Sequence, residues 1–215
     1  VSKSGQDYWL DLSILPLCNA AGEVTHFAAI ERDITDQVEV VNALEVLSNT
    51  DHLTGLLNRR AFDISLQIAL LQQTITRAPH TIIMFDLDFF KRVNDEHGHA
   101  VGDQVLIAVS AQCRAHFRSS DVVARVGGEE FMVLLETDIE HAQRLAESFR
   151  EAVAGMKISY SEDKYLQVTI SVGVAAMVTT DIASHLSDAR TLLKRVDDAL
   201  YLAKQSGRNR VVVDA

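Results

Sequence analysis

Two groups of acidic residues are the first sign of chemistry in this sequence. Asp86 and Asp88 close an apolar run at 81–88, and their spacing of two residues places both carboxylates on one face of a strand. Carboxylates at a strand's end are well placed to hold Mg²⁺, a hard cation that prefers oxygen ligands. A lone Asp-x-Asp is more commonly a solvated turn, so this pair needs support from elsewhere in the chain.

The second acidic group is the segment Gly127-Gly128-Glu129-Glu130-Phe131. Its two glycines permit a tight turn with positive φ and leave room for a ligand near the backbone. Its two adjacent acids repel each other unless a positive group lies beside them. An exposed acidic hairpin would explain these five residues alone. The two acidic groups together favour a shared metal site.

Helices and strands are expected to alternate along the part of the chain that carries these acids. Periodicity and breakers predict helices at 59–77, 102–117, 139–153 and 186–205. Strands are predicted at 81–88, 121–126, 131–135, 166–175 and 210–213, with a hairpin signal at 127–128. The order predicts an α/β or α+β domain, in which helices cover one central sheet.

The N-terminal part of the chain has a different pattern. Strands are expected at 7–17 and 25–33, joined by a turn at 19–23. A helix is expected to follow them, because Ile34, Val38, Val41, Leu44 and Leu47 recur at spacings of three or four.

The composition limits the classes of function. The 215 residues are 47% hydrophobic and 23% charged, which is typical of a soluble globular protein. The net charge of −10 disfavours broad nucleic-acid binding but allows a nucleotide substrate.

No apolar run approaches the roughly 20 residues of a membrane span. No signal peptide is recognisable, although the abrupt start suggests a fragment and leaves an upstream membrane segment open. Cys18 and Cys113 fit no metal or redox spacing, and we expect two reduced core thiols in a cytoplasmic protein.

Several motifs in order resemble the GGDEF family of diguanylate cyclases, in its GGEEF form. The resemblance covers residues 51–215. It rests on Asp51-His-Leu-Thr-Gly-Leu-Leu-Asn-Arg-Arg60, Phe85-Asp-Leu-Asp-Phe-Phe-Lys-Arg-Val-Asn-Asp95, Gly98-His-Ala-Val-Gly-Asp103, the signature at 127–131, Ser171-Val-Gly-Val174, Ala199-Leu-Tyr-Leu-Ala-Lys204 and Gly207-Arg-Asn-Arg210. The fold that it implies is a central, mostly antiparallel sheet flanked by helices, which resembles the catalytic palm of class III nucleotide cyclases and some polymerases.

The resemblance implies a metal site with two Mg²⁺ or Mn²⁺ ions. Asp86, the main-chain carbonyl of Leu87 and Glu129 would hold the metal. The family more commonly has Ile at position 87, which matters little for a backbone ligand. Glu129 is also the expected base for the ribose 3′-hydroxyl, and Glu130 is expected to assist in or near the site.

The resemblance also implies a nucleotide site. Asn94 and Asp103 would read guanine, and His99 would touch the substrate or have a plain structural role. Leu53, Phe89 and Leu106 would form an apolar base pocket or belong to the ordinary core. The triphosphate would be bound by Lys91, Lys204 and Arg208. Since the last two lie four residues apart, we expect them to share one face at a helix end.

The reaction implied is condensation of two GTP molecules into cyclic di-GMP and two pyrophosphates across a homodimer. Arg118 and Asp121 match the family's RxxD inhibitory site for product. Residues 5–35 resemble the last strands of a PAS-type sensor. The expected organisation is a sensor remnant at 1–35, a helical connector at 36–50 that could pair as a coiled coil, and the catalytic domain at 51–215.

Two alternatives use the same motifs. A GGDEF module without activity would only bind GTP or cyclic di-GMP and regulate a partner, but such modules usually lose signature acids or base-reading residues that this chain keeps. A polymerase-like palm acting on nucleic acid is disfavoured by the acidic balance and the absence of a basic groove.

Overall fold

The computed structural model describes residues 8–38, 40, 49–161, 164–178 and 185–214. The chain divides into two compact units, Val1–Ser48 and Asn49–Ala215. Among the described residues, no helix combines the length and the apolar character needed to cross a membrane.

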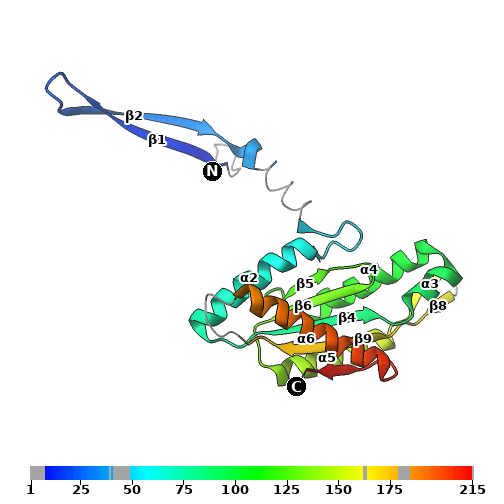
Figure 1. The fold of residues 1–215 in the computed structure, drawn as a ribbon. Coiled ribbons are helices and arrows are strands. Elements are labelled where there is room, and N and C mark those ends of the chain that lie inside the picture. The colour runs from blue at the N-terminus through cyan, green and yellow to red at the C-terminus, as the bar shows by residue number, and fades with distance from the viewer. Residues whose placement is uncertain (1–7, 39, 41–48, 162–163, 179–184, 215) are drawn as a thin grey trace. The chain divides into compact units, whose positions relative to one another are not determined.

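A six-stranded sheet forms the centre of the second unit (Figure 1). Its strand order is β10-β9-β4-β6-β5-β3. The bounds are β3 Leu57–Asn58, β4 Thr81–Leu87, β5 Val122–Arg125, β6 Glu130–Leu135, β9 Ile170–Ala176 and β10 Val211–Val213. The pairs β4–β6, β4–β9 and β5–β6 are antiparallel, whereas β9–β10 and β3–β5 are parallel. The predicted mixed domain with a mostly antiparallel sheet is therefore confirmed.

Helices cover both faces of this sheet (Figure 1). Their bounds are α2 Arg59–Thr76, α3 Phe90–His97, α4 His99–His116, α5 Ile139–Gly155 and α6 His185–Gln205. Alternate residues of β4 belong to two separate apolar clusters: Phe85 packs with residues of α4 and α5, and Met84 with residues of α2 and α6. Burial on both faces explains why β4 is continuously apolar until Asp86.

The sequence prediction missed several short elements. A single helix was expected at 102–117, but α4 begins at His99, and a separate α3 precedes it. Gly98, with φ 85°, divides the two helices. The strand expected at 166–175 begins only at Ile170, because residues Lys164–Leu166 form β8 and pair with β7, Ile158–Ser161, in a small separate sheet. These strands are too short and too polar for alternation to reveal them.

The N-terminal unit contains an antiparallel hairpin of β1, Leu10–Cys18, and β2, Val24–Asp33. Nearly every residue of both strands is exposed, including Ile14 and Phe27. The expectation of two core thiols is wrong for Cys18, which is exposed, and right for Cys113, whose thiol pKa is raised by burial. Of the helix predicted at 36–50, residues 36–38, 40 and 49 are described and helical, and most of the remainder lies outside the described residues.

Gly173 allows α6 to pack directly on β9. A Cβ atom at this position would collide with the backbone of α6, at the Val196 carbonyl and the Leu200 nitrogen. Backbone atoms of a packed helix cannot move aside as a flexible side chain can. A glycine at position 173 is thus a condition for the observed distance between helix and sheet.

We therefore expect Gly173→Ala to lower the free energy of unfolding by about 1–3 kcal/mol. Urea unfolding followed by circular dichroism measures this loss. Gly155→Ala is the matched control, because a Cβ atom at that position would have no neighbour within 4 Å and the stability should change by no more than about 0.5 kcal/mol. Equal unfolding midpoints for Gly173→Ala and the parent would contradict the packing argument.

Candidate active site

The two acidic groups of the sequence meet at one end of the central sheet. Asp86 lies directly opposite Glu130 in the antiparallel pairing of β4 and β6. The Leu87 N–H donates a hydrogen bond of 3.3 Å to the Glu129 carbonyl. Strand pairing alone thus brings together the residues that the sequence suggested as metal ligands.

A lysine from a third element joins this group. Lys204 of α6 places its Nζ 2.9 Å from the carboxylate of Asp86, whose side chain is only 9% exposed. Burial raises the pKa of Asp86 above its usual value, Lys204 opposes this shift, and the charges of Glu130 and Asp88 add to it. Burial and the charge of Asp86 likewise raise the pKa of Glu129. The site therefore holds more negative charge than Lys204 neutralises.

This excess of charge fits the requirement of a divalent cation. Within the described part of the chain, no three or more His, Cys, Asp or Glu side chains form a group that could hold a metal by themselves. The predicted set needs only two carboxylates, Asp86 and Glu129, and the backbone carbonyl of Leu87. Oxygen ligands of this kind suit Mg²⁺, which keeps several water ligands.

An arginine that sequence reasoning missed holds the acidic hairpin. Arg125 donates to the Gly128 carbonyl from Nε and Nη2, at 3.1 and 2.7 Å, and from Nη1 to Asp51 at 3.0 Å. Asp51 also accepts hydrogen bonds from the Thr54 N–H and hydroxyl. Burial by itself would raise the pKa of Asp51, but its hydrogen bonds to Thr54 and Arg125 outweigh this effect and lower the pKa. The first residue of the domain's opening motif is thereby linked to the signature hairpin. The position of Arg125, two residues before the glycines of the hairpin, was the available signal.

The signature glycines do not have the predicted conformation. Among the described residues, the glycines with positive φ are Gly22, Gly55, Gly98 and Gly207, so neither Gly127 nor Gly128 needs the left-handed region. The limited space beside position 127 explains the glycine there instead. A Cβ there would collide with the Glu130 carboxylate, so glycine leaves room for that side chain.

Asn94 and Asp103, the expected guanine-reading pair, lie on neighbouring helices. Asn94 of α3 is half-buried against Gly102 of α4, and a Cβ at Gly102 would collide with the Asn94 amide oxygen. Asp103 follows Gly102 and is exposed. Lys91 and His99 are also exposed, on α3 and at the start of α4.

The three apolar residues suggested around the base have different environments. Leu106 is 2% exposed and belongs to the main core, against which Leu53 packs. Phe89 is 62% exposed. Leu106 thus fits the ordinary-core interpretation, while Phe89 is available at the surface.

Lys204 and Arg208 do not share a helical face, and that prediction is wrong. Helix α6 ends at Gln205, and Arg208 lies in the following loop with φ 61°. Its guanidinium lies 4.5 Å from the centre of the Phe89 ring, within the range of a cation–π contact. Lys204 remains on the helix and contacts Asp86.

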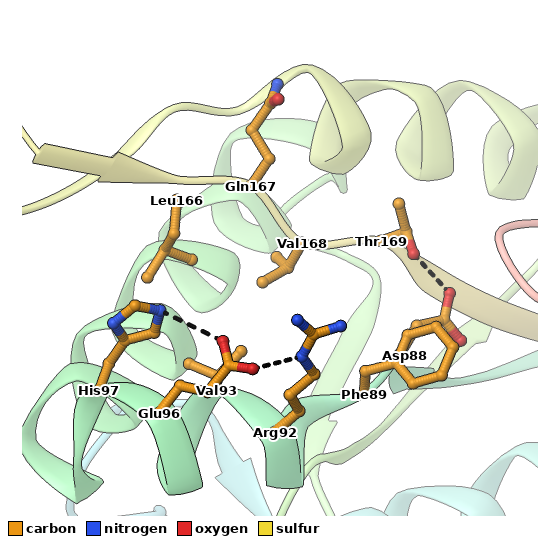
Figure 2. Close-up of a pocket in the computed structure, with 10 residues that line it drawn as sticks. All are labelled: Asp88, Phe89, Arg92, Val93, Glu96, His97, Leu166, Gln167, Val168 and Thr169. Carbon is orange, nitrogen blue, oxygen red and sulfur yellow. Dashed lines mark hydrogen bonds and ion pairs between the residues drawn. The ribbon is translucent and has the colours of Figure 1, made fainter.

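A hollow of about 270 Å³ lies between α3 and residues 166–169 (Figure 2). Arg92 and Glu96, which line it, form an ion pair of 2.5 Å. Neither Asn94 nor Asp103 lines this hollow, so it is not the predicted guanine pocket. Asp88 lies at its edge, where Figure 2 shows its carboxylate bonded to Thr169.

The RxxD residues border a different cavity. The Arg118 N–H donates to the Asp121 carboxylate at 2.8 Å. Both residues line a hollow of about 460 Å³ together with Arg114 and Phe117. This cavity and the acidic site share no lining residue.

A sheet covered by helices on both faces, with an acidic hairpin beside a buried aspartate, defines a catalytic domain of the cyclase palm type. Residues 48–210 match the family described as "Diguanylate cyclase, GGDEF domain". The chain belongs to this family.

Named relatives agree with this assignment. The chain is 39% identical over 184 residues to Diguanylate cyclase DgcM of Escherichia coli (strain K12), covering 85% of the chain and 42% of that protein. It is 39% identical over 168 residues to Response regulator PleD of Caulobacter vibrioides (strain NA1000 / CB15N), covering 77% and 36%. The chain thus spans less than half the length of these curated relatives.

A solved structure has the same fold. It is the coiled coil and GGDEF domain of DgcB from Caulobacter crescentus in complex with c-di-GMP. The TM-score is 0.77 at 27% identity, covering 84% of this chain and 93% of that one.

The close contact of Gly102 with Asn94 generates a prediction. Gly102→Ala should displace the Asn94 amide and weaken guanine-nucleotide binding about tenfold, the cost of one lost hydrogen bond. Calorimetric titration with GTP measures the effect. In an Asn94→Ala background the collision is gone, so Gly102→Ala should weaken GTP binding by less than about a further twofold. Equal losses in both backgrounds would show that Gly102 acts on something other than Asn94.

Proposed function

We propose that this domain is an active diguanylate cyclase that condenses two GTP molecules into cyclic di-GMP and releases two pyrophosphates. The observation that carries the proposal is the meeting of Asp86, Leu87 and Glu129 beside Lys204. Membership of the GGDEF family supports it. The chain also keeps Asn94 and Asp103, the pair that would recognise guanine.

The metal site proposed is formed by Asp86, the Leu87 carbonyl and Glu129, with Glu130 assisting. Two Mg²⁺ or Mn²⁺ ions bound there would stabilise charge on the reacting phosphate and help pyrophosphate to leave. Glu129 accepts the proton of the ribose 3′-hydroxyl. Its raised pKa makes it a stronger base, but the ionised form is lost as the pH falls through that value, so activity should decline towards acid pH.

The nucleotide is held by groups on three helices, α3, α4 and α6, and on the loop that follows α6. Asn94 and Asp103 bind the guanine edge, and His99 contacts the substrate near them. Lys91, Lys204 and Arg208 bind the triphosphate. Lys204 neutralises Asp86 at 2.9 Å in the structure, and a metal ion on Asp86 would replace this contact and free the ammonium for phosphate.

Catalysis requires two copies of the domain. Each proposed site holds one GTP, and the 3′-oxygen of one GTP must attack the α-phosphorus of the other in line. Two domains must therefore face each other across a two-fold axis. We propose a homodimer with its active site at the interface.

We further propose that residues 1–35 are the end of a PAS-type sensor, that 36–50 connect it to the catalytic domain at 51–215, and that the sensor controls the dimer. The exposed apolar side chains of β1 and β2 support this, because an isolated two-stranded hairpin is marginally stable. Reduced cysteines and a GTP substrate are consistent with a cytoplasmic location.

Replacing the proposed base tests the chemistry. Glu129→Gln should lower the rate of cyclic di-GMP formation at least about a hundredfold, or roughly 2.7 kcal/mol. Stability should stay equal or rise, because the raised pKa shows that the folded state disfavours the ionised carboxylate. The assay incubates protein with GTP and Mg²⁺ and separates cyclic di-GMP and pyrophosphate by chromatography.

Glu140→Gln, an exposed change on α5, is the matched control and should keep the parent rate. Near-normal turnover of Glu129→Gln would contradict its role. A parent that binds GTP and forms no product would favour the alternative of a regulatory module without activity.

Product inhibition through Arg118 and Asp121 is the second proposal open to test. An arginine can pair with the guanine O6 and N7 atoms or with phosphate, and Asp121 can accept from guanine N1–H and N2–H₂. Arg118→Ala should keep the basal rate but weaken inhibition by cyclic di-GMP about ten- to hundredfold, for a loss of about 1.5–3 kcal/mol. Initial rates against added product measure this, with Ser120→Ala as control, because Ser120 is exposed and does not line the cavity that Arg118 and Asp121 border. Superimposable inhibition curves for Arg118→Ala and the parent would exclude the motif as the inhibitory site.

A further inference from the structure

Asp88 is the second acid of the Asp-x-Asp motif, and both of its carboxylate oxygens accept hydrogen bonds from protein groups. The residue is only 5% exposed. Oδ1 accepts from the Ser171 hydroxyl at 2.6 Å, and Oδ2 accepts from the Thr169 hydroxyl at 2.7 Å and the Asn209 N–H at 3.0 Å. These three bonds compensate the burial of the charge. Asp88 would have to give up such bonds to bind a metal.

One of these bonds reaches a loop with unusual backbone geometry. Gly207, Arg208 and Asn209 have φ values of 114°, 61° and 46°. Asparagine adopts the left-handed region readily, but for Arg208 this conformation is costly and persists only where neighbouring contacts enforce it. Asn209 has two such contacts: its N–H donates to Asp88, and its side-chain oxygen accepts from Arg150 Nη1 at 2.7 Å.

The conformation of this loop determines where Arg208 lies. The guanidinium is 4.5 Å from the centre of the Phe89 ring. Phe89 follows Asp88 in the chain, and Figure 2 labels both residues. The φ of Phe89 is itself 57°. Asp88 is thus joined to both partners of this contact, to Phe89 by the peptide bond and to the Arg208 loop by the hydrogen bond to Asn209.

We propose that Asp88 is a positioning residue, which holds the loop at 207–210 so that Arg208 is directed to the substrate's triphosphate. Asp86 and Asp88 then have separate tasks, although they lie two residues apart. Asp86 faces Lys204 and the acidic hairpin, whereas Asp88 fixes the position of Arg208. The effect on GTP rests on the proposed function, but the effect on the loop does not.

Asp88→Ala tests the positioning, because it removes both carboxylate oxygens and with them all three hydrogen bonds. Asn would be a weaker test, since an amide oxygen can still accept from Thr169 and Asn209. We expect the KM for GTP to rise about tenfold with kcat changed less than about threefold, since the loop binds phosphate and does not perform the proton transfer. Ser171→Ala is the matched control. It removes a bond to the same carboxylate on the β9 side and should change KM less than about twofold.

A double-mutant cycle separates positioning from a general structural defect. If Asp88 acts through Arg208, then Asp88→Ala should add less than about twofold to the KM in an Arg208→Ala background. A full tenfold increase in that background would overturn the proposal. An equal KM for Asp88→Ala and the parent would overturn it as well.

Amide hydrogen exchange without nucleotide tests the loop independently of activity. The Asn209 amide of the parent should exchange at least about a hundredfold more slowly than a free amide, although the residue is exposed. Asp88→Ala should remove most of this protection, while Ser171→Ala should keep it. Fast exchange in the parent overturns the proposal even if the variant fails to fold. Protection that depends on Asp88, in a parent that forms no cyclic di-GMP, would contradict the proposed function alone.

Discussion

Buried negative charge at the end of β4 is the constraint on which the site depends. Asp86 is almost fully buried, and strand pairing sets Glu129 and Glu130 beside it. Carboxylates that share a dry environment raise one another's pKa and cost folding energy unless cations compensate. Lys204 supplies part of this compensation. The remaining charge is what a catalytic metal site requires, so the fold accepts a local cost for its proposed chemistry.

Hydrogen-bonded charges around this centre restrict its movement. Arg125 joins the acidic hairpin to Asp51 at the beginning of the domain. Asp88 joins the end of β4 to β9 and to the loop after α6. Each link connects segments far apart in the sequence. Together they give the end of the sheet a defined geometry that does not depend on apolar packing alone.

Glycine has three different tasks in this domain. Gly98 adopts a positive φ and separates α3 from α4. Gly173 allows the backbone of α6 to approach the sheet. Gly102 and Gly127 leave space for the side chains of Asn94 and Glu130. The last task concerns only the site, so these two positions connect local packing with proposed substrate and metal binding.

The sequence by itself determined the main elements, because β4 is apolar from Ile82 to Phe85 and the helices α2, α5 and α6 have strong periodicity and recognisable ends. The order of motifs also determined the family. Only the tertiary structure decided which partners Asp86 and Asp88 contact, where Arg208 lies beyond the end of α6, and what Arg125 binds. Alternation along a strand reports which face a side chain occupies and does not report its partner. Those partners, Lys204, Thr169, Ser171 and Asn209, come from distant segments, and the left-handed conformation of Arg208 is enforced by contacts that form only when these segments pack together.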